Sequence, residues 1–128
     1  KGRMVFEDCL GTCRFCTWTE LRLVTKAVNA ATGWNMGVDE AMDVGRRTVN
    51  LLRAFNVRHG ITTEGEKPSL RYGSVPVDGP VKNKGIGPEW DAMLDNYYGL
   101  MGWDRQTGKP LPETLKKYGL EQQLQDLW

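Results

Sequence analysis

The chain has 128 residues, which is enough for one domain with its own core but short for a complete enzyme of average size. Its 17 basic and 16 acidic residues leave a formal net charge of +1, and no basic run is long enough to follow a phosphate backbone, which argues against a nucleic-acid partner. No apolar run approaches the roughly 18 residues that cross a bilayer, and the first residues lack a signal-peptide pattern. We therefore expect no membrane span and a location in the cytoplasm.

Two helices are predicted in the first half of the chain. In residues 17–31 apolar residues recur at intervals of three and four, and Gly33 follows as a natural C-terminal cap. Residues 39–59 predict the longest helix, because they open with two acids and close with basic residues before Gly60. The residues expected on one face of that helix are Met42, Val49, Leu52, Phe55 and Asn56.

Two or three further helices are predicted in the second half. One opens with Pro88 at its first position and runs to Gly102, with apolar residues at helical spacing. Residues 112–118 predict a short helix, and residues 120–128 can form another. Because no stretch has the alternating pattern of strands, the predicted fold class is all-α, a multihelical domain with one long irregular segment.

The irregular segment is residues 61–87, where glycines and prolines recur too often for a helix or a central strand to persist. Structureless loops of this length are uncommon in compact domains unless they are functional or lie over another surface. The segment also carries apolar side chains that a linker would not need, namely Leu70, Tyr72, Val75, Val77 and Val81. We expect an extended segment packed across a neighbouring domain, so that the chain is part of a larger protein.

The three cysteines, Cys9, Cys13 and Cys16, follow one another as C-x3-C-x2-C. An odd number of clustered cysteines indicates metal binding in a reducing compartment rather than a disulfide framework. Their spacing resembles the [4Fe-4S] loop of radical S-adenosylmethionine enzymes, but that family surrounds the loop with alternating strands and helices. A zinc site that adds His59 is a weaker alternative, because the gap is wide and no second cysteine pair exists. A third alternative is a non-catalytic helical interaction module.

A second resemblance covers the chain from about Glu7 to Leu120. The segments that carry it, in this order, are "DCLGTCRF", "NAATGW", "GRRTVNLLRAFNVRHG", "MLDNYYGLMGWD", "TGKP" and "LKKYGL". Together they resemble the C-terminal part of the aldehyde ferredoxin oxidoreductase family, whose members use a tungsten or molybdenum bis-pyranopterin and one [4Fe-4S] cluster. The resemblance implies that residues 1–128 are the C-terminal helical domain of a larger oxidoreductase.

The most informative motif of the family is D-x-x-G-L-C-x, which corresponds here to residues 8–14. The resemblance implies that Asp8 accepts hydrogen bonds from a pterin, and that Gly11 lets the backbone turn closely beside the cofactor. Cys13 would be one thiolate ligand of the [4Fe-4S] cluster. Thr12, which stands where the family usually has leucine, and Arg14 would flank the pterin.

The same resemblance leaves Cys9 and Cys16 as buried, apolar fillers, and His59 as a cation near a helix C-terminus. The other three cluster ligands and the catalytic residues would lie upstream, so the chain by itself is expected to be inactive.

Two further sets of residues are expected to have structural rather than catalytic roles. Four arginines are expected to meet acids on neighbouring elements, and most tryptophans are expected in the core. These residues are Arg46, Arg47, Arg53 and Arg58, and Trp18, Trp34, Trp90, Trp103 and Trp128.

The implied activity is oxidation of aldehydes to carboxylic acids, with electrons leaving through the cluster to ferredoxin or to an iron–sulfur subunit. A related activity within the family is reduction of an aromatic ring in a thioester substrate. The expected partners are therefore the rest of the oxidoreductase chain and an electron carrier, and a homodimer is a possible assembly.

Overall fold

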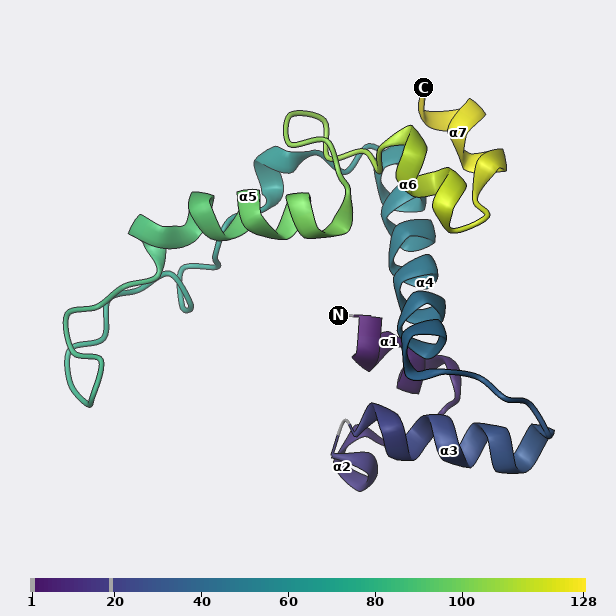
Figure 1. The fold of residues 1–128 in the computed structure, drawn as a ribbon. Coiled ribbons are helices and arrows are strands. Elements are labelled where there is room, and N and C mark those ends of the chain that lie inside the picture. The colour runs from purple at the N-terminus through teal and green to yellow at the C-terminus, as the bar shows by residue number, and fades with distance from the viewer. Residues whose placement is uncertain (1, 19) are drawn as a thin grey trace.

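The computed structural model describes residues 2–18 and 20–128, and within these ranges the chain is a set of helices joined by loops (Figure 1). The α-helices are α1 (Gly2–Cys9), α2 (Arg14–Thr17), α3 (Leu21–Thr32), α4 (Val38–Arg58), α5 (Trp90–Met101), α6 (Pro112–Lys117) and α7 (Glu121–Leu127). Two short 3-10 helices are η1 (Thr63–Gly65) and η2 (Gly87–Glu89). The described residues contain no strand beyond an isolated bridge between Trp103 and Pro110, so the predicted all-α class is confirmed.

Helix α4 is the central helix, the spine against which other helices pack. In Figure 1, α1 and α3 lie toward its N-terminal end, α6 and α7 lie beside its C-terminal end, and α5 extends to the side. Helix α1 packs closely on α4 because two glycines face each other: a Cβ on Gly45 would collide with the backbone of Gly2. The close approach fixes α1, and therefore the loop that follows it, against the spine.

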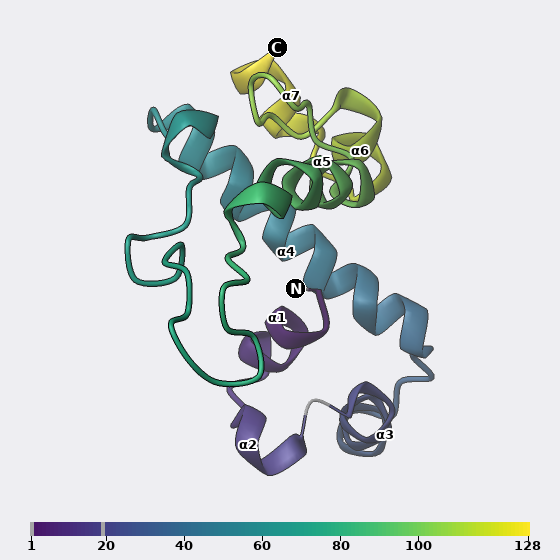
Figure 2. The ribbon, with the colours of Figure 1, turned by 90° about the vertical axis from the view of Figure 1, so that its left-hand side faces the viewer.

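The core is divided into three clusters along α4 rather than gathered in one place. The first joins α1, α3 and α4 through Phe6, Leu21, Val24 and Ala41. The second joins α4 to α6 and α7 through Ala54, Leu115, Leu120 and Leu127, and the third consists of Val49, Tyr98 and Trp103. Figure 2 shows α5 nearly end-on in front of α4 and next to α6. Many large apolar side chains stay exposed around these three small clusters.

Most helix boundaries agree with the sequence predictions. The helix predicted over residues 17–31 begins only at Leu21. Before it, the short helix α2 ends at Trp18, which has a left-handed conformation with φ of 50°. Residue 19 of that prediction lies outside the described residues. Pro88 lies in η2, one turn before α5 begins at Trp90. Helix α1 was not predicted.

The predicted face of α4 is wrong for most of its members. Val49 is buried, but Leu52, Phe55 and Asn56 are exposed and Met42 is half-buried. The buried residues of α4 are Ala41, Gly45, Val49, Asn50, Arg53 and Ala54. Small residues allow neighbouring helices to approach this face. Of its two polar residues, Asn50 accepts a hydrogen bond from the Trp103 indole N–H at 2.7 Å, and the partners of Arg53 are described below.

The expectation that most tryptophans lie in the core is also wrong. All five lie within the described ranges, and Trp103 is buried while Trp90 is half-buried. Trp18, Trp34 and Trp128 are exposed. Exposed indoles on a small domain indicate apolar surface that the chain does not cover by itself.

Residues 66–86 run between η1 and η2 as an open loop, teal to green in Figures 1 and 2. The predicted irregular segment therefore has the expected local structure. Its apolar side chains project from the chain: Leu70 is 97% exposed, and Tyr72 and Val77 are exposed as well. In the described part of the chain, no helix is both long enough and apolar enough to span a membrane.

Candidate functional site

The residues that the sequence singled out lie in one short loop, from the last turn of α1 to the end of α2. Helix α1 ends in a turn in which the Gly11 N–H donates to the Asp8 carbonyl oxygen at 3.1 Å. Gly11 has φ of 67°, a left-handed conformation that disfavours side chains. A Cβ at this position would meet nothing within 4 Å in the described residues. Within this chain, glycine is therefore required by the backbone conformation and not by a close neighbour.

Cys13 follows this turn and is the N-cap residue of α2, with its side chain exposed. Hydrogen bonds from the backbone N–H of Phe15, and then from that of Cys16, lower the pKa of the Cys13 thiol below its ordinary value. Thiolate is the form of cysteine that binds metals. The loop therefore presents one exposed sulfur whose ionised form is favoured by the main chain.

Asp8 and Arg14 face each other across the loop. An Arg14 guanidinium nitrogen lies 3.4 Å from one carboxylate oxygen of Asp8 and 3.5 Å from the other. Both side chains are substantially exposed, so the pair contributes little to stability. The Asp8 carboxylate keeps room to accept further hydrogen bonds, as a ligand with adjacent N–H groups would require.

Cys9 and Cys16 are exposed, so the expectation that they are buried fillers is wrong. Cys9 is the last residue of α1 and precedes the turn that leads to Cys13. Its sulfur lies 3.6 Å from the hydroxyl of Thr48 in α4. His59 lies at the predicted helix end, as the C-cap residue of α4, and its ring centroid lies 4.3 Å from that of Phe55. Within residues 2–18 and 20–128, no three His, Cys, Asp or Glu side chains come together as a metal site. In the described residues the three cysteines are therefore not gathered into one preassembled metal site.

Glu7 is a residue of this loop that the sequence analysis missed. Its side chain is completely buried, with 0% exposure, although it is an acid. One carboxylate oxygen accepts a hydrogen bond from the Thr17 hydroxyl at 2.8 Å, and the other has no partner among the described residues. The Thr12 hydroxyl donates to the Glu7 carbonyl oxygen at 3.1 Å, which gives the threonine a local role where the family usually has leucine. Only a prediction of α1 and its buried face could have revealed Glu7.

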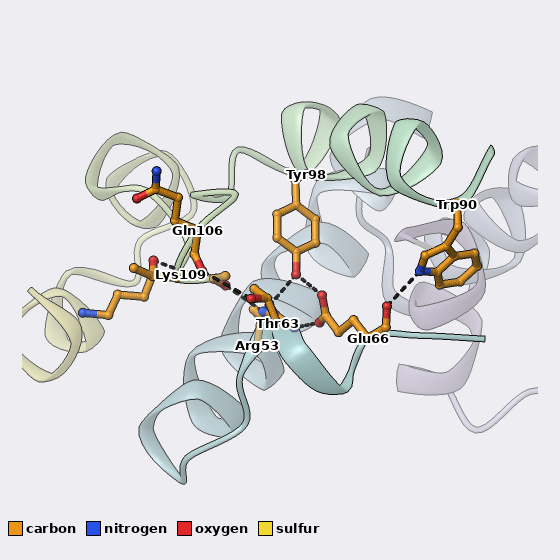
Figure 3. A network of polar contacts seen from close by, with 9 residues as sticks. Arg53, Thr63, Glu66, Trp90, Tyr98, Gln106 and Lys109 are labelled. Carbon is orange, nitrogen blue, oxygen red and sulfur yellow. Dashed lines mark hydrogen bonds and ion pairs between the residues drawn. The ribbon is translucent and has the colours of Figure 1, made fainter. Parts of the chain in front are cut away.

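A second polar cluster lies near the C-terminal end of α4, centred on Arg53 (Figure 3). Its guanidinium donates to the Gly108 carbonyl oxygen at 2.7 Å and to the Tyr98 hydroxyl at 2.8 Å, and it forms an ion pair with Glu66. The Tyr98 hydroxyl in turn donates to the other Glu66 oxygen. The guanidinium carbon also lies 4.7 Å from the ring centroid of Trp103. These contacts join α4, α5 and both flanking loops.

Burial first, and then the hydrogen bond to Glu66, raises the pKa of Tyr98 to about 12. Arg53, Glu66 and Tyr98 line a pocket of about 350 Å³ whose other walls are mainly apolar. Their polar atoms are already used by one another, so the cluster is a structural connection rather than an open binding site. A phenol with such a high pKa is also a poor proton donor near neutral pH.

The four arginines only partly follow the expectation. Arg53 pairs with Glu66, and Arg58 pairs with Asp126 of α7 at 2.9 Å, which confirms the prediction of acids on neighbouring elements. Arg46 instead pairs with Asp43 of its own helix at 3.0 Å. Arg47 donates to the Gly119 carbonyl oxygen at 3.3 Å.

Comparison with known proteins identifies the class of this domain. The family described as "Aldehyde ferredoxin oxidoreductase, domains 2 & 3" matches residues 1–120. The chain therefore belongs to the aldehyde ferredoxin oxidoreductase family, as the motif around Cys13 indicated.

Three relatives have the name "Tungsten-containing aldehyde ferredoxin oxidoreductase". The protein of Pyrococcus horikoshii is 35% identical over an alignment of 118 residues, and the match covers 90% of this chain and 19% of that protein. The proteins of Pyrococcus abyssi and Pyrococcus furiosus are 32% and 31% identical, over 90% and 88% of this chain. The chain spans about a fifth of the length of these curated relatives.

Proposed function

We propose that residues 1–128 are the C-terminal helical domain of a cytoplasmic oxidoreductase with a tungsten or molybdenum bis-pyranopterin and one [4Fe-4S] cluster. The complete enzyme oxidises an aldehyde with water to a carboxylic acid, and releases two protons and two electrons. The electrons pass to ferredoxin or to a partner iron–sulfur subunit. The observation that carries this proposal is the loop 8–14, where the family motif presents the exposed thiol of Cys13, whose pKa is lowered by main-chain hydrogen bonds, and the exposed carboxylate of Asp8.

The donor set of the loop fits the proposed cofactors. Cys13 offers a single sulfur, as one ligand of a cluster whose other three ligands come from elsewhere in the chain. Asp8 accepts hydrogen bonds from the pterin, and its weak pairing with Arg14 leaves the carboxylate able to do so. Gly11 shapes the turn, while Thr12 and Arg14 flank the pterin. When bound, the metal–pterin group and the cluster supply the redox chemistry, and the domain positions them.

Exposed apolar side chains support the proposal that the domain packs against the rest of a longer polypeptide. They occur on the cysteine loop, on α4 and along residues 66–86. The larger ones are Phe15, Trp18, Leu52, Phe55, Leu70, Tyr72 and Val77. So many large exposed apolar side chains on a domain of this size support packing against further parts of a longer polypeptide. The length of the relatives provides the additional chain that would cover it.

The test compares three serine substitutions in the full-length protein: Cys13→Ser, Cys9→Ser and Cys16→Ser. Iron content and the paramagnetic resonance spectrum of the reduced cluster are measured for each. We expect Cys13→Ser to lose the cluster or change its spectrum, and the other two variants to match the wild type. Dependence on all three cysteines, together with cleavage of S-adenosylmethionine, would instead assign the loop to a radical enzyme. An unchanged cluster in Cys13→Ser would overturn the proposal.

A further inference from the structure

We infer that Glu7 is the positioning residue of the loop that carries Asp8 and Cys13, and that its side chain sets where the Cys13 sulfur lies. The inference rests on the proposed function of this loop. It assigns a role to a residue outside the D-x-x-G-L-C-x motif, through contacts that only the folded chain shows.

Glu7 holds both ends of the loop at once. Its carbonyl oxygen accepts hydrogen bonds from the Leu10 N–H at 3.0 Å, the Thr12 N–H at 3.3 Å and the Thr12 hydroxyl at 3.1 Å. Its side chain accepts the hydrogen bond from Thr17, the last residue of α2, at 2.8 Å. Cys13 lies between these two attachment points, so Glu7 limits the positions that its backbone can occupy.

Glu7 is itself held by a fixed part of the fold. The preceding residue, Phe6, belongs to the buried cluster that includes Leu21 and Ala41, and the other end of α1 lies against α4 at the contact between Gly2 and Gly45. The position of the loop is therefore connected to the spine of the domain through a single short helix. A loop tied to a packed element holds a ligand more accurately than a free loop does.

The burial of Glu7 is costly for stability. A fully buried acid is rare, and its second oxygen has no hydrogen-bond partner among residues 2–18 and 20–128. An apolar residue of similar size would fill the same space without this cost. In the same loop the buried Nε of Arg14 also has no partner among the described residues. An unsatisfied acceptor and an unsatisfied donor together indicate that the loop is completed by groups outside this chain.

The experiment uses the full-length holoenzyme and two pairs of variants. Glu7→Leu removes the acceptor, whereas Glu7→Gln keeps an oxygen that can accept from Thr17. Thr17→Val removes the donor, whereas Thr17→Ser keeps the hydroxyl. Glu113→Leu makes the same change at an exposed acid on α6 and serves as the control. The readouts are the paramagnetic resonance spectrum and midpoint potential of the reduced cluster, the rate of iron loss to a chelator, and amide hydrogen exchange of residues 10–17.

We expect Glu7→Leu and Thr17→Val to change the spectrum, shift the potential and increase both iron loss and loop exchange several-fold. Glu7→Gln, Thr17→Ser and Glu113→Leu should match the wild type. If Glu7→Leu does not fold, Thr17→Val gives the same test. Unchanged spectra and exchange in the two disruptive variants would overturn the inference. A different outcome separates the two proposals. If Glu7→Leu and Thr17→Val increase loop exchange but Cys13→Ser leaves the cluster unchanged, Glu7 positions the loop and the proposed function is wrong.

Discussion

Arg53 and Glu7 are both buried charged side chains, but their polar atoms are satisfied to different degrees. Arg53, in the C-terminal half of α4, donates to a carboxylate, a phenol oxygen and a main-chain carbonyl of the same chain. Glu7, on α1 beside the N-terminal half of α4, accepts one hydrogen bond, and its second oxygen accepts none within the described residues.

The difference in hydrogen bonding indicates different roles for the two buried charges. A buried ion whose partners all come from one domain can stabilise that domain, because breaking the set leaves unpaired charges. A buried ion with a vacant acceptor position gives little stability, and we infer that Glu7 is retained for its role in the loop that it holds. Arg53 therefore has its polar partners within this chain, whereas Glu7 has one carboxylate oxygen without a partner among the described residues.

The largest expected effect is from Arg53→Leu, which leaves Glu66 without its counter-ion and removes a donor from Tyr98. We expect the free energy of unfolding of the 128-residue chain to fall by about 3–5 kcal/mol, the usual cost of breaking a buried pair. Urea denaturation followed by circular dichroism measures it. The control is Arg58→Leu, since its pair with Asp126 is largely exposed and should contribute less than about 1 kcal/mol. If both substitutions lower the free energy of unfolding equally, the buried Arg53 cluster is no more important for stability than the exposed Arg58 pair.

A pH titration of stability tests the same cluster through Tyr98. Its pKa is raised to about 12 in the folded chain, so the neutral phenol stabilises the fold below pH 10 and this stability is lost as pH rises toward 12. The loss corresponds to about 2–3 kcal/mol for a group that is almost fully buried. Urea denaturation between pH 9 and 12 should show this decline in the wild type and a much smaller one in Tyr98→Phe. The same slope in both would mean that another group causes it.

Gly45→Ala tests how firmly α1 is held against α4. The added Cβ would collide with the Gly2 backbone, so we expect a loss of about 1–3 kcal/mol, as for other overpacked contacts. The matched control is Gly99→Ala in α5, where a Cβ would meet nothing within 4 Å among the described residues. That substitution should stabilise the chain by up to about 1 kcal/mol. Thermal unfolding of the two variants in parallel distinguishes them, and an unchanged melting temperature in Gly45→Ala would contradict the close packing.

The smallest expected change in stability is from Glu7→Leu. Removing a half-satisfied buried acid should alter the free energy of unfolding by less than about 1 kcal/mol, because the lost hydrogen bond offsets the relieved desolvation. Urea denaturation measures this beside Arg53→Leu. A loss as large as that of Arg53→Leu would show that Glu7 is chiefly a structural residue, and the contrast between the two charges would disappear.

Local signals in the sequence predicted much of the fold. The spacing of apolar residues and the positions of capping residues predicted α3 to α7 within a few residues, because helix hydrogen bonds and caps join residues close in sequence. The buried face of α4 was mispredicted, because Leu52 and Phe55 match a helical stripe as well as buried residues do. Which stripe is buried depends on the helices that pack against it, and hydropathy alone does not contain that information.

The sequence by itself determined the helical class, the irregular segment and the family, and it placed the candidate ligands together because Asp8 to Arg14 are contiguous. Only the tertiary structure decided which charges are buried and how they are satisfied. The partners of Arg53 lie 13 to 55 residues away along the chain, and the contact of Glu7 with Thr17 depends on a turn that reverses the backbone. Periodicity records neighbours along a helix, whereas these contacts arise only when separate elements pack.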